Sequence, residues 1–269
     1  MFMKIQTMFM KKTALLITWL VLTAGVTSAG LFDFWRTGGD KGPVTEQQLN
    51  QGLVLHMTFE RDETAGRVAD TSGCGNDGRA TGVRWTPDGK KGGAYEFTAD
   101  GDQILVPNSP SLNPGRFTLS SWIKTTTGDH YWRRIFDKSY TREFALSVAG
   151  DWQNNKYYGQ VSMEIGPGTH FALTTKRVDD GQWHHVATTL DGTNEVVYVD
   201  GQVAAQTRWQ RSGKAGTTDF DLVIGCNRSN LAKSEDDLGV SFRGMISQPM
   251  IWSRALSPEE VAFLFRSQQ

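Results

Sequence analysis

Residues 180–202 read DGQWHHVATTLDGTNEVVYVDGQ. Two Asp-Gly pairs, Asp191-Gly192 and Asp200-Gly201, separate short runs that are rich in Val, Thr and Tyr. Asp-Gly tolerates the positive φ angles of tight hairpin turns, and Val, Thr and Tyr favour extended backbone. The stretch is therefore typical of consecutive antiparallel strands joined by two hairpins.

Runs of the same kind lie on both sides of this stretch, bounded by turn-forming residues. They are LVLHMTF (53–59), AYEF (94–97), QILV (103–106), RFTLSSWIK (116–124), DLVIGCN (221–227) and FRGMISQPMIW (242–252). In the fourth run, Phe117, Leu119 and Ile123 fall on one face of a strand. Many short strands with almost no helix predict an all-β fold, a two-sheet antiparallel β-sandwich or jelly roll.

One helix is predicted, near residue 260. Ser257 is a good N-cap, Pro258 suits the first helical position, and Glu260 completes a capping box. The apolar run VAFLF (261–265) follows directly. The sandwich is therefore expected to end in a short C-terminal helix.

The first residues have the pattern of a secretory signal. Lys11 and Lys12 precede an apolar run, residues 14–24, that is too short to span a bilayer comfortably. The small residues Thr27-Ser28-Ala29 suit a cleavage site. We expect a cleaved signal peptide over residues 1–29 and a secreted or extracytoplasmic protein, with an uncleaved membrane anchor as the alternative.

The rest of the chain is expected to form one domain. Residues 30–51 mix Gly, Pro and polar residues and are interpreted as a linker, which leaves residues 52–269 as the domain. The chain has a formal net charge of −1, and removal of residues 1–29 takes away three lysines and no acidic residue. A mildly acidic domain offers no electrostatic case for a nucleic acid or an anionic membrane as partner.

The adjacent histidines of the opening stretch are interpreted as structural. Successive side chains of a strand point to opposite faces, so His184 and His185 cannot bind one metal ion together. The other histidines, His56, His130 and His170, are scattered through the sequence. We therefore expect a scaffold role here, not a catalytic or metal site.

Residues 180–202 and six further segments in order resemble one family, the concanavalin A-like, laminin-G-like jelly-roll domains of the pentraxin-related superfamily. Besides residues 180–202 they are GLVLHMTFE (52–60), DTSGCGNDG (70–78), GGAYEFTADGDQILVPNSPSLNP (92–114), FTLSSWIKTT (117–126), LVIGCN (222–227) and FRGMISQPMIWSRALSPEE (242–260). The resemblance covers residues 52 to about 265. It implies two antiparallel sheets face to face, and a non-catalytic extracellular module that binds carbohydrate or other proteins.

No catalytic signature is present in the sequence. Glycoside hydrolysis needs two carboxylates across a cleft, and the closely spaced E-x-D-x-x-E acids of catalytic relatives on this sandwich are missing. We therefore expect a protein that is not an enzyme, with a lectin-like or adhesion function. A structural or protein-interaction module of the cell surface is the alternative, and a divergent polysaccharide hydrolase or lyase is the third reading.

Aromatic residues in segments expected to be loops are the candidate ligand site. Flat rings stack on the apolar faces of sugars, while neighbouring polar groups bind the hydroxyls. The candidates are Tyr131, Trp132, Trp152, Asn154, Tyr157, Tyr158 and Trp209. The alternative is that these rings cover the open ends of the core. Trp183 and Trp252 are expected to pack within strands. Trp122 lies on the face opposite to Leu119 and Ile123, where it could line a concave sheet surface, but the resemblance implies a structural role for it. The expected partner is an extracellular glycan or a cell-surface protein.

The chain contains two cysteines, Cys74 and Cys226. In an exported protein an even number of cysteines favours a disulfide, although the sequence does not show that the two are close. The resemblance implies that the loop containing Cys74 packs near the C-terminal strand that pairs with LVIG (222–225). On that basis we predict a Cys74–Cys226 disulfide.

The resemblance also bears on calcium. Several relatives bind a structural Ca²⁺ between a D-x-S-G-x-x-N loop, matched here by Asp70 and Asn76, and an acidic pair in the final strand. Ser247 and Gln248 occupy the acidic positions, and Ca²⁺ affinity falls as carboxylates are lost. We therefore predict no cofactor and at best a weak calcium site. Pro249, which lacks a backbone N–H, predicts an edge or a bulge in this strand.

Overall fold

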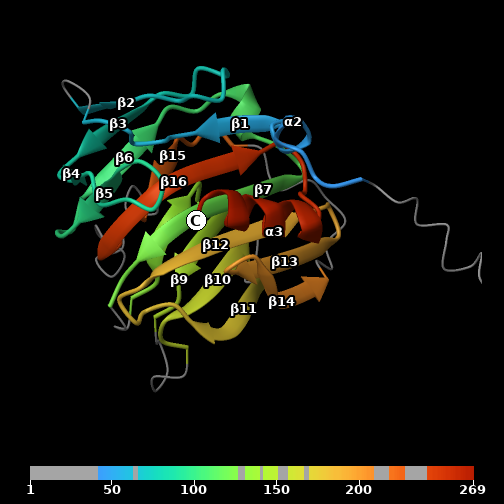
Figure 1. The fold of residues 1–269 in the computed structure, drawn as a ribbon. Helices are drawn as coiled ribbons and strands as arrows, with labels where there is room; N and C mark the ends of the chain where they lie inside the picture. Colours follow the sequence, from blue (N-terminus) through green and yellow to red (C-terminus); the bar gives the residue numbers. More distant parts are fainter. Residues whose placement is uncertain are drawn as a thin grey trace, which may run out of the picture. The chain divides into compact units, whose positions relative to one another are not determined.

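The computed structural model describes residues 42–62, 66–126, 131–139, 142–150, 157–166, 170–208, 218–227 and 241–269. Its elements in chain order are α2 (Glu46–Leu49), β1 (Leu53–His56), β2 (Arg67–Val68), β3 (Gly78–Thr81), β4 (Arg84–Thr86), β5 (Ala94–Phe97), β6 (Gln103–Val106), the 3-10 turn η3 (Pro110–Leu112), β7 (Phe117–Lys124), β8 (Arg133–Asp137), β9 (Phe144–Val148), β10 (Gln160–Ile165), β11 (His170–Arg177), β12 (Trp183–Leu190), β13 (Asn194–Val199), β14 (Gln202–Arg208), β15 (Leu222–Ile224), β16 (Gly244–Trp252) and α3 (Pro258–Ser267). Figure 1 shows these elements as a ribbon.

The strands form two antiparallel sheets, which confirms the predicted β-sandwich. Sheet A has the order β14-β13-β12-β7-β16-β5-β4, and β1 also pairs with β16. Sheet B has the order β11-β10-β9-β8-β15-β6-β3-β2. The opening stretch of the sequence supplies β12, β13 and the start of β14, and the predicted hairpin turns lie between them.

The main core lies between the inner faces of the two sheets. Leu119 and Ile123 of β7 and Val186 of β12 belong to the same buried cluster as Phe136 and Leu146 of sheet B. In β7 and β12 these residues alternate with outward-facing ones, as the sequence periodicity predicts, whereas in β8 a register shift lets both Ile135 and Phe136 enter the core. Their burial is the main source of the domain's stability, because removal of apolar surface from water is the dominant favourable contribution to folding.

A second buried cluster lies on the outer face of sheet A, under helix α3. Figure 1 shows α3, in red, lying across the strands of this sheet. The Trp122 ring stacks on Phe265 of α3 at 5.6 Å between centroids, and its Nε1 donates to Gln268 Oε1 at 2.8 Å. Trp252 belongs to this cluster, and Trp122 is buried on the same face of the sheet. Trp122 and Trp252 therefore have the packing role expected from the sequence.

Strand β16 contains the irregularity that Pro249 predicts. Its register against β7 shifts between Ser247 and Met250, and Gln248 has a φ of 53°, in the left-handed region. The strand is not at an edge: it pairs with β7 on one side, and on the other with β5 before the shift and β1 after it. The missing N–H is accommodated as a bulge.

The predicted capping box of α3 is present, and a second capped helix lies within the expected linker. Ser257 Oγ accepts from Glu260 N at 3.3 Å, as the local sequence indicates. Helix α2 begins after Thr45, whose side chain caps it together with Gln48. Its only buried residue is Leu49, whose carbonyl accepts from Trp252 Nε1 at 2.7 Å. The compact unit accordingly begins at residue 44, inside the range 30–51.

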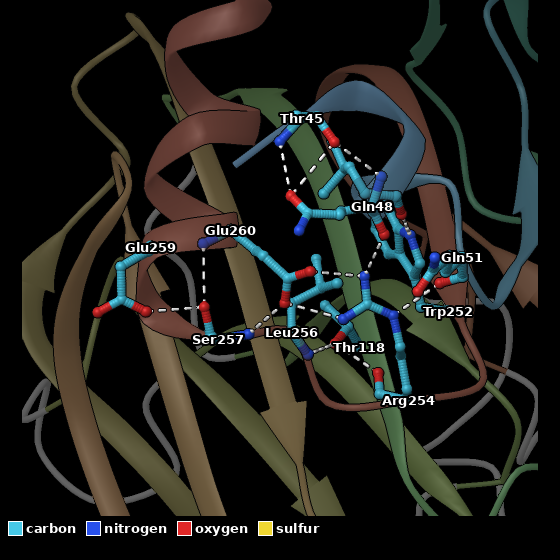
Figure 2. Close-up of polar contacts among 11 residues, drawn as sticks. Thr45, Gln48, Gln51, Thr118, Trp252, Arg254, Leu256, Ser257, Glu259 and Glu260 are labelled. Atoms are coloured by element: carbon cyan, nitrogen blue, oxygen red, sulfur yellow. Dashed lines mark hydrogen bonds and ion pairs between the residues drawn. The ribbon is translucent and has the colours of Figure 1, made fainter. Parts of the chain in front are cut away.

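Arg254 joins the two helices, as Figure 2 shows. Its guanidinium donates to the carbonyls of Gln51 and Gln48 at 2.6 and 2.9 Å, where α2 ends, and forms a two-pronged ion pair with Glu260 at 2.7 and 2.8 Å. The backbone carbonyl of Arg254 accepts from Thr118 on β7. One side chain thus satisfies carbonyls of α2 and a carboxylate in the first turn of α3.

We expect Arg254→Ala to lower the free energy of unfolding by about 2 kcal/mol, because it removes charge-assisted hydrogen bonds to the Glu260 carboxylate and to the Gln48 and Gln51 carbonyls. Urea unfolding measures the change. The matched control is Arg84→Ala, which removes an exposed ion pair with Glu96 and should cost less than about 1 kcal/mol. Equal losses for the two variants would contradict this role of Arg254.

Candidate functional site

The register of sheet B gathers aromatic residues from two separate segments at one end of the sandwich. Val148 of β9 pairs with Arg133 at the start of β8 and with Val161 at the start of β10. The residues that directly precede β8 and β10 therefore lie at the same end of the sheet. We call these four residues the aromatic rim: Tyr131, Trp132, Tyr157 and Tyr158.

Tyr131 is the most exposed member of the rim. Its side chain is 40% exposed, and the Arg133 guanidinium lies 5.1 Å from the centroid of its ring. Arg133 is itself buried, donates to the Ser241 carbonyl at 2.7 Å and lies 3.8 Å from the Asp100 carboxylate. Trp132 is half-buried. A fixed cation next to an exposed ring favours one orientation of that ring.

The other aromatic candidates fall outside this description. Trp152 and Asn154 lie outside the described residues, between Gly150 and Tyr157. Trp209 is also outside them. It follows Arg208, which pairs with Asn194.

Backbone bonds show which end of sheet A adjoins the rim. Val178 donates to the Gly159 carbonyl, next to Tyr158, and Gly181 donates to the Thr125 carbonyl at the end of β7. Asn194 begins β13 at the other end of the hairpin, opposite the start of β7. Arg208 therefore lies at the end of the sandwich away from the rim. The described chain brings together four of the seven candidates.

The two adjacent histidines occupy opposite faces of β12. His185 is fully buried on the outer face, 5.4 Å from the Trp122 ring and 5.9 Å from Phe265, with Nε2 2.8 Å from Ser120 Oγ. His184 lies with Nδ1 3.0 Å from Asp200 and Nε2 3.1 Å from Asp180. This geometry agrees with the scaffold role expected for both.

Opposite surroundings shift the two imidazole pKa values in opposite directions. His185 is buried and its imidazole has no hydrogen bond to a carboxylate, so burial lowers its pKa to about 4. The hydrogen bond to Asp200 raises the pKa of His184 above its ordinary value, and Asp180 adds to that effect. His185 is thus neutral at pH 7, whereas His184 holds its proton more tightly than a free histidine.

The predicted disulfide is wrong, because both cysteines are free. Cys74 is exposed, with Sγ 3.8 Å from the Leu53 carbonyl. Cys226 is buried beyond the end of β15, where its backbone forms an isolated antiparallel β-bridge with Ser241. Ser241 Oγ donates to the carbonyl of Asp102, which directly precedes β6.

The loop of Cys74 adjoins the opposite end of β6. Asn76 donates to Ser111 and accepts from Ser109, which follow that strand. The length of β6 therefore separates the two thiols. A disulfide requires the two Cα atoms to lie within about 7 Å of each other.

Asp70 organises the D-x-S-G loop. Its Oδ1 accepts from the backbone of His56 and Ser72, both at 2.9 Å, and its Oδ2 accepts from Asn76 N at 2.9 Å and Ser72 Oγ at 2.8 Å. Asn76 is buried and donates to the Val54 carbonyl at 2.7 Å. The loop is therefore fixed by hydrogen bonds from its own amides, as is common for Asp in turns.

The sequence did not indicate a cavity between α2, β1, β16 and α3. It has a volume of about 440 Å³, and its lining includes His56, Lys91 and Gln248. The sequence signals near it were the D-x-S-G-x-x-N loop, Gln248 and Pro249, which bore on calcium and on the bulge but did not predict a pocket. Within the described ranges, no group of three or more His, Cys, Asp or Glu side chains is arranged to hold a metal ion. No helix among the same residues has the length and apolar character needed to cross a membrane.

Residues 98–262 match the laminin-G-type family model described as the concanavalin A-like lectin/glucanases superfamily. This match covers more than half of the chain. The chain belongs to the concanavalin A-like lectin/glucanases superfamily. The two-sheet sandwich described above is the fold that this membership implies.

Relatives of this superfamily member include pentraxin-containing proteins. Human pentraxin-4 is 27% identical over 191 residues, which is 63% of this chain and 37% of that protein. The rat sushi, von Willebrand factor type A, EGF and pentraxin domain-containing protein 1 is 35% identical over 92 residues, 34% of this chain and 3% of that protein. The chain thus spans about a third of the first relative and a small part of the second.

Solved structures with the same concanavalin A-like fold include binding domains. The binding domain of Paraclostridial Mosquitocidal Protein 1 matches with a TM-score of 0.65 at 18% identity, over 82% of this chain and 53% of that one. Domain 4 of AbnA, a GH43 extracellular arabinanase from Geobacillus stearothermophilus solved with arabinotriose, matches with a TM-score of 0.61 at 20% identity, over 79% of this chain and 97% of that one. A botulinum neurotoxin type C structure matches with a TM-score of 0.62 at 15% identity, over 84% of this chain and 53% of that one. At these identities the likeness establishes the fold alone.

The adjacent histidines should give opposite pH dependences. Below pH 6.5 the unfolded chain protonates His185 while the folded chain does not until about pH 4, so this residue costs stability as the pH falls. His184 contributes stability below pH 6.5 that is lost as the pH rises through its raised pKa. From pH 8 to pH 5, the destabilisation caused by His185→Gln should therefore decrease, by about 1–2 kcal/mol, whereas that caused by His184→Gln should increase. Urea unfolding of both variants at the two pH values measures this, and changes of the same sign would refute the assignment.

Proposed function

We propose that this domain is a non-catalytic, lectin-like module that recognises extracellular carbohydrate through the aromatic rim. The observation that carries the proposal is the convergence of Tyr131 and Trp132 with Tyr157 and Tyr158 at one end of sheet B. Rings supplied by two separate segments form a broader platform than one loop provides. A platform of this kind stacks on the C–H face of a sugar ring.

Arg133 supports the rim in two ways. Its guanidinium is fixed by the Ser241 carbonyl and lies against the Tyr131 ring, which restricts the ring before a ligand arrives. A side chain that is already ordered loses less conformational entropy on binding. The Asp100 carboxylate, which is 57% exposed, bonds to Arg243 at 2.7 Å and can also accept from sugar hydroxyls.

The solved structures with this fold give independent support. Domain 4 of the arabinanase AbnA was solved with arabinotriose, and the botulinum neurotoxin type C work describes interaction with two ganglioside molecules. Both ligands contain sugars. We propose the same class of ligand, a carbohydrate, for this chain, and the proposal does not name a particular glycan.

The proposal excludes catalysis on the chemistry of the described carboxylates beside the rim. Asp100 bonds to Arg243, and Asp179 forms an ion pair with Arg177. Each carboxylate is bound by an arginine of the scaffold, whereas glycoside hydrolysis needs a pair of carboxylates that face the substrate across a cleft. A pair of carboxylates in which one donates a proton is therefore not expected there.

Export belongs to the same proposal. The signal-like pattern of residues 1–29 lies outside the described residues, and it favours a secreted or extracytoplasmic protein. A glycan or a cell-surface protein is then the accessible partner.

We also propose that the domain needs no calcium. Gln248 Nε2 donates to the Thr58 carbonyl at 2.9 Å and to the Lys91 carbonyl. An amide N–H group supplies to these oxygens the positive partial charge that a cation would otherwise supply. Asp70 is engaged in its own loop, so one carboxylate cannot compensate for the acidic residues missing at Ser247 and Gln248.

The calcium proposal predicts the same melting temperature in millimolar Ca²⁺ and in EDTA. Gln248→Glu should melt at a lower temperature in EDTA, because its carboxylate faces two carbonyl oxygens, and Ca²⁺ should restore part of the loss. Differential scanning fluorimetry measures both. A large calcium-dependent rise in the unmodified protein that Asp70→Ala abolishes would show that a calcium site is present.

The rim proposal predicts specific signal on a glycan array that includes bacterial and plant polysaccharides. Tyr131→Ala and Trp132→Ala should each weaken binding to the glycan found by roughly tenfold or more, since each removes a stacking surface. The matched control is Phe220→Ala, because Arg142 lies over the Phe220 ring at 5.9 Å in the same way as Arg133 lies over Tyr131. Silence across the array with capture of a protein partner would favour the protein-interaction reading, and product release from a polysaccharide would favour the enzyme.

A further inference from the structure

The 440 Å³ cavity on the outer side of sheet A is separate from the aromatic rim. It is bounded by α2, by β1 and the residues that follow it, by the bulge of β16, and by the last turns of α3. Apolar side chains line the part of the cavity near Leu53, namely Leu49, Leu53, Met250 and Leu264, together with polar residues of α2 and α3, namely Glu46, Asn50, Ser267 and Gln268. Polar side chains line the end near Thr58, namely His56, Thr58, Glu60, Thr71, Lys91 and Gln248.

Gln248 is the most strongly constrained residue of the polar end. Its backbone has a φ of 53°, which is costly for a residue with a side chain, and it is 3% exposed. Its amide nitrogen donates to the Thr58 and Lys91 carbonyls, and its amide oxygen lies 2.8 Å from His56 Nε2. Residues in such backbone conformations cluster at functional sites, so this one directs attention to the cavity.

The Gln248 hydrogen bonds determine the tautomer of His56. Because the amide nitrogen serves two carbonyl oxygens, the amide oxygen is an acceptor, and His56 Nε2 must donate to it. Burial lowers the pKa of His56, so the ring is neutral at pH 7 and Nδ1 has a free lone pair. No described group donates to that nitrogen: the other bonds of His56 are backbone bonds to Asp70 and Thr71.

His56 lines the cavity, and its Nδ1 lone pair can accept a hydrogen bond from an O–H or N–H donor of a ligand. Thr58 and Thr71 add hydroxyl groups, and Glu60 and Lys91 add one acceptor and one donor of opposite charge. The charged groups of the lining are Glu46, Glu60 and Lys91, which sum to −1, so the lining does not favour an anionic ligand. Hydroxyl groups, which both donate and accept, match this set.

We propose that this cavity is a second saccharide subsite, which binds a neutral sugar unit with a hydroxyl donating to His56 Nδ1. The C–H face of the sugar packs on Leu53 and Met250, and the remaining hydroxyls meet Thr58 and Lys91. A second cavity of about 190 Å³ shares Thr58, Glu60 and Thr71 with the first, and its other lining residues include Arg61, Arg67 and Tyr95. It has room for the neighbouring unit of an oligosaccharide. This site does not depend on the rim.

The test follows the His56 imidazole directly in protein labelled with ¹⁵N at histidine. The probes are the neutral methyl glycosides of glucose, galactose, mannose, arabinose and N-acetylglucosamine, titrated one by one. At least one should shift the His56 Nδ1 signal saturably, because a lone pair that accepts a hydrogen bond changes its shielding. A panel that leaves this signal unmoved overturns the proposal.

Two neighbouring exposed residues provide a matched pair of variants. Asn50 lines the cavity, and Gln51 does not. Asn50→Trp should fill the cavity mouth and raise the dissociation constant measured at His56 by about tenfold or more, whereas Gln51→Trp should leave it within about twofold. Equal effects of the two substitutions, or full binding by Asn50→Trp, overturn the proposal.

A third variant separates this subsite from the rim. Trp132→Ala should leave the glycoside-dependent shift of His56 unchanged even where it abolishes binding on the glycan array. Loss of the His56 shift in Trp132→Ala would mean that the rim is the single binding site, and would overturn the cavity proposal while leaving the rim proposal intact. If the unmodified protein shows the glycoside-dependent His56 shift but no signal on the glycan array, the rim proposal is overturned and the cavity proposal stands.

Discussion

The central strand β7 must bury both of its faces, and most of the architecture follows from that constraint. Leu119 and Ile123 point inward and need sheet B, whereas Trp122 points outward and needs another cover. Helix α3 supplies it, with Phe265 over the indole and Gln268 at its Nε1. An amphipathic helix of ten residues is only marginally stable alone, so its own capping and the Arg254–Glu260 contact that fixes its first turn become necessary parts of the same cover.

The same arrangement produces the cavity beside β1. Arg254 and Trp252 hold α2 against β1 while α3 crosses the sheet, and the bulge at Gln248 interrupts β16 between them. A helix on each side of an interrupted strand cannot fill the space over the interruption. Polar groups then line that space, and the Gln248 side chain donates to two backbone carbonyls there, those of Thr58 and Lys91. The aromatic rim has a different origin, because it arises only from the register of β8, β9 and β10.

Local signals in the sequence predicted local structure well. The Asp-Gly turns, the Ser257 capping box and the bulge at Pro249 each depend on residues within a few positions, and the ordered segments identified the family and the two-sheet fold. The candidate site depended on long-range register. The sequence marked Tyr131 and Tyr157 as loop aromatics, but only the shared pairing with Val148 brings their segments together. The cysteine pair was wrong for the same reason, since nothing local shows that β6 lies between Cys74 and Cys226. The sequence did not predict helix α2, which lies in the stretch interpreted as a linker. Its one buried residue, Leu49, is held by Trp252, which is 203 positions away in the sequence.

The pairing of β1 with β16 has a consequence for how the chain folds. The Trp252 indole bonds to the Leu49 carbonyl across 203 positions of sequence, and Leu53 pairs with Trp252 itself. Contacts between such distant residues require the entropy of a large loop to be lost before any contact is gained, and they slow folding. Sheet A therefore cannot acquire β1 until β16 has been synthesised. The growing chain cannot pair β1 with β16 until nearly all of the domain has left the ribosome, and only then can α2 and α3 pack against these strands.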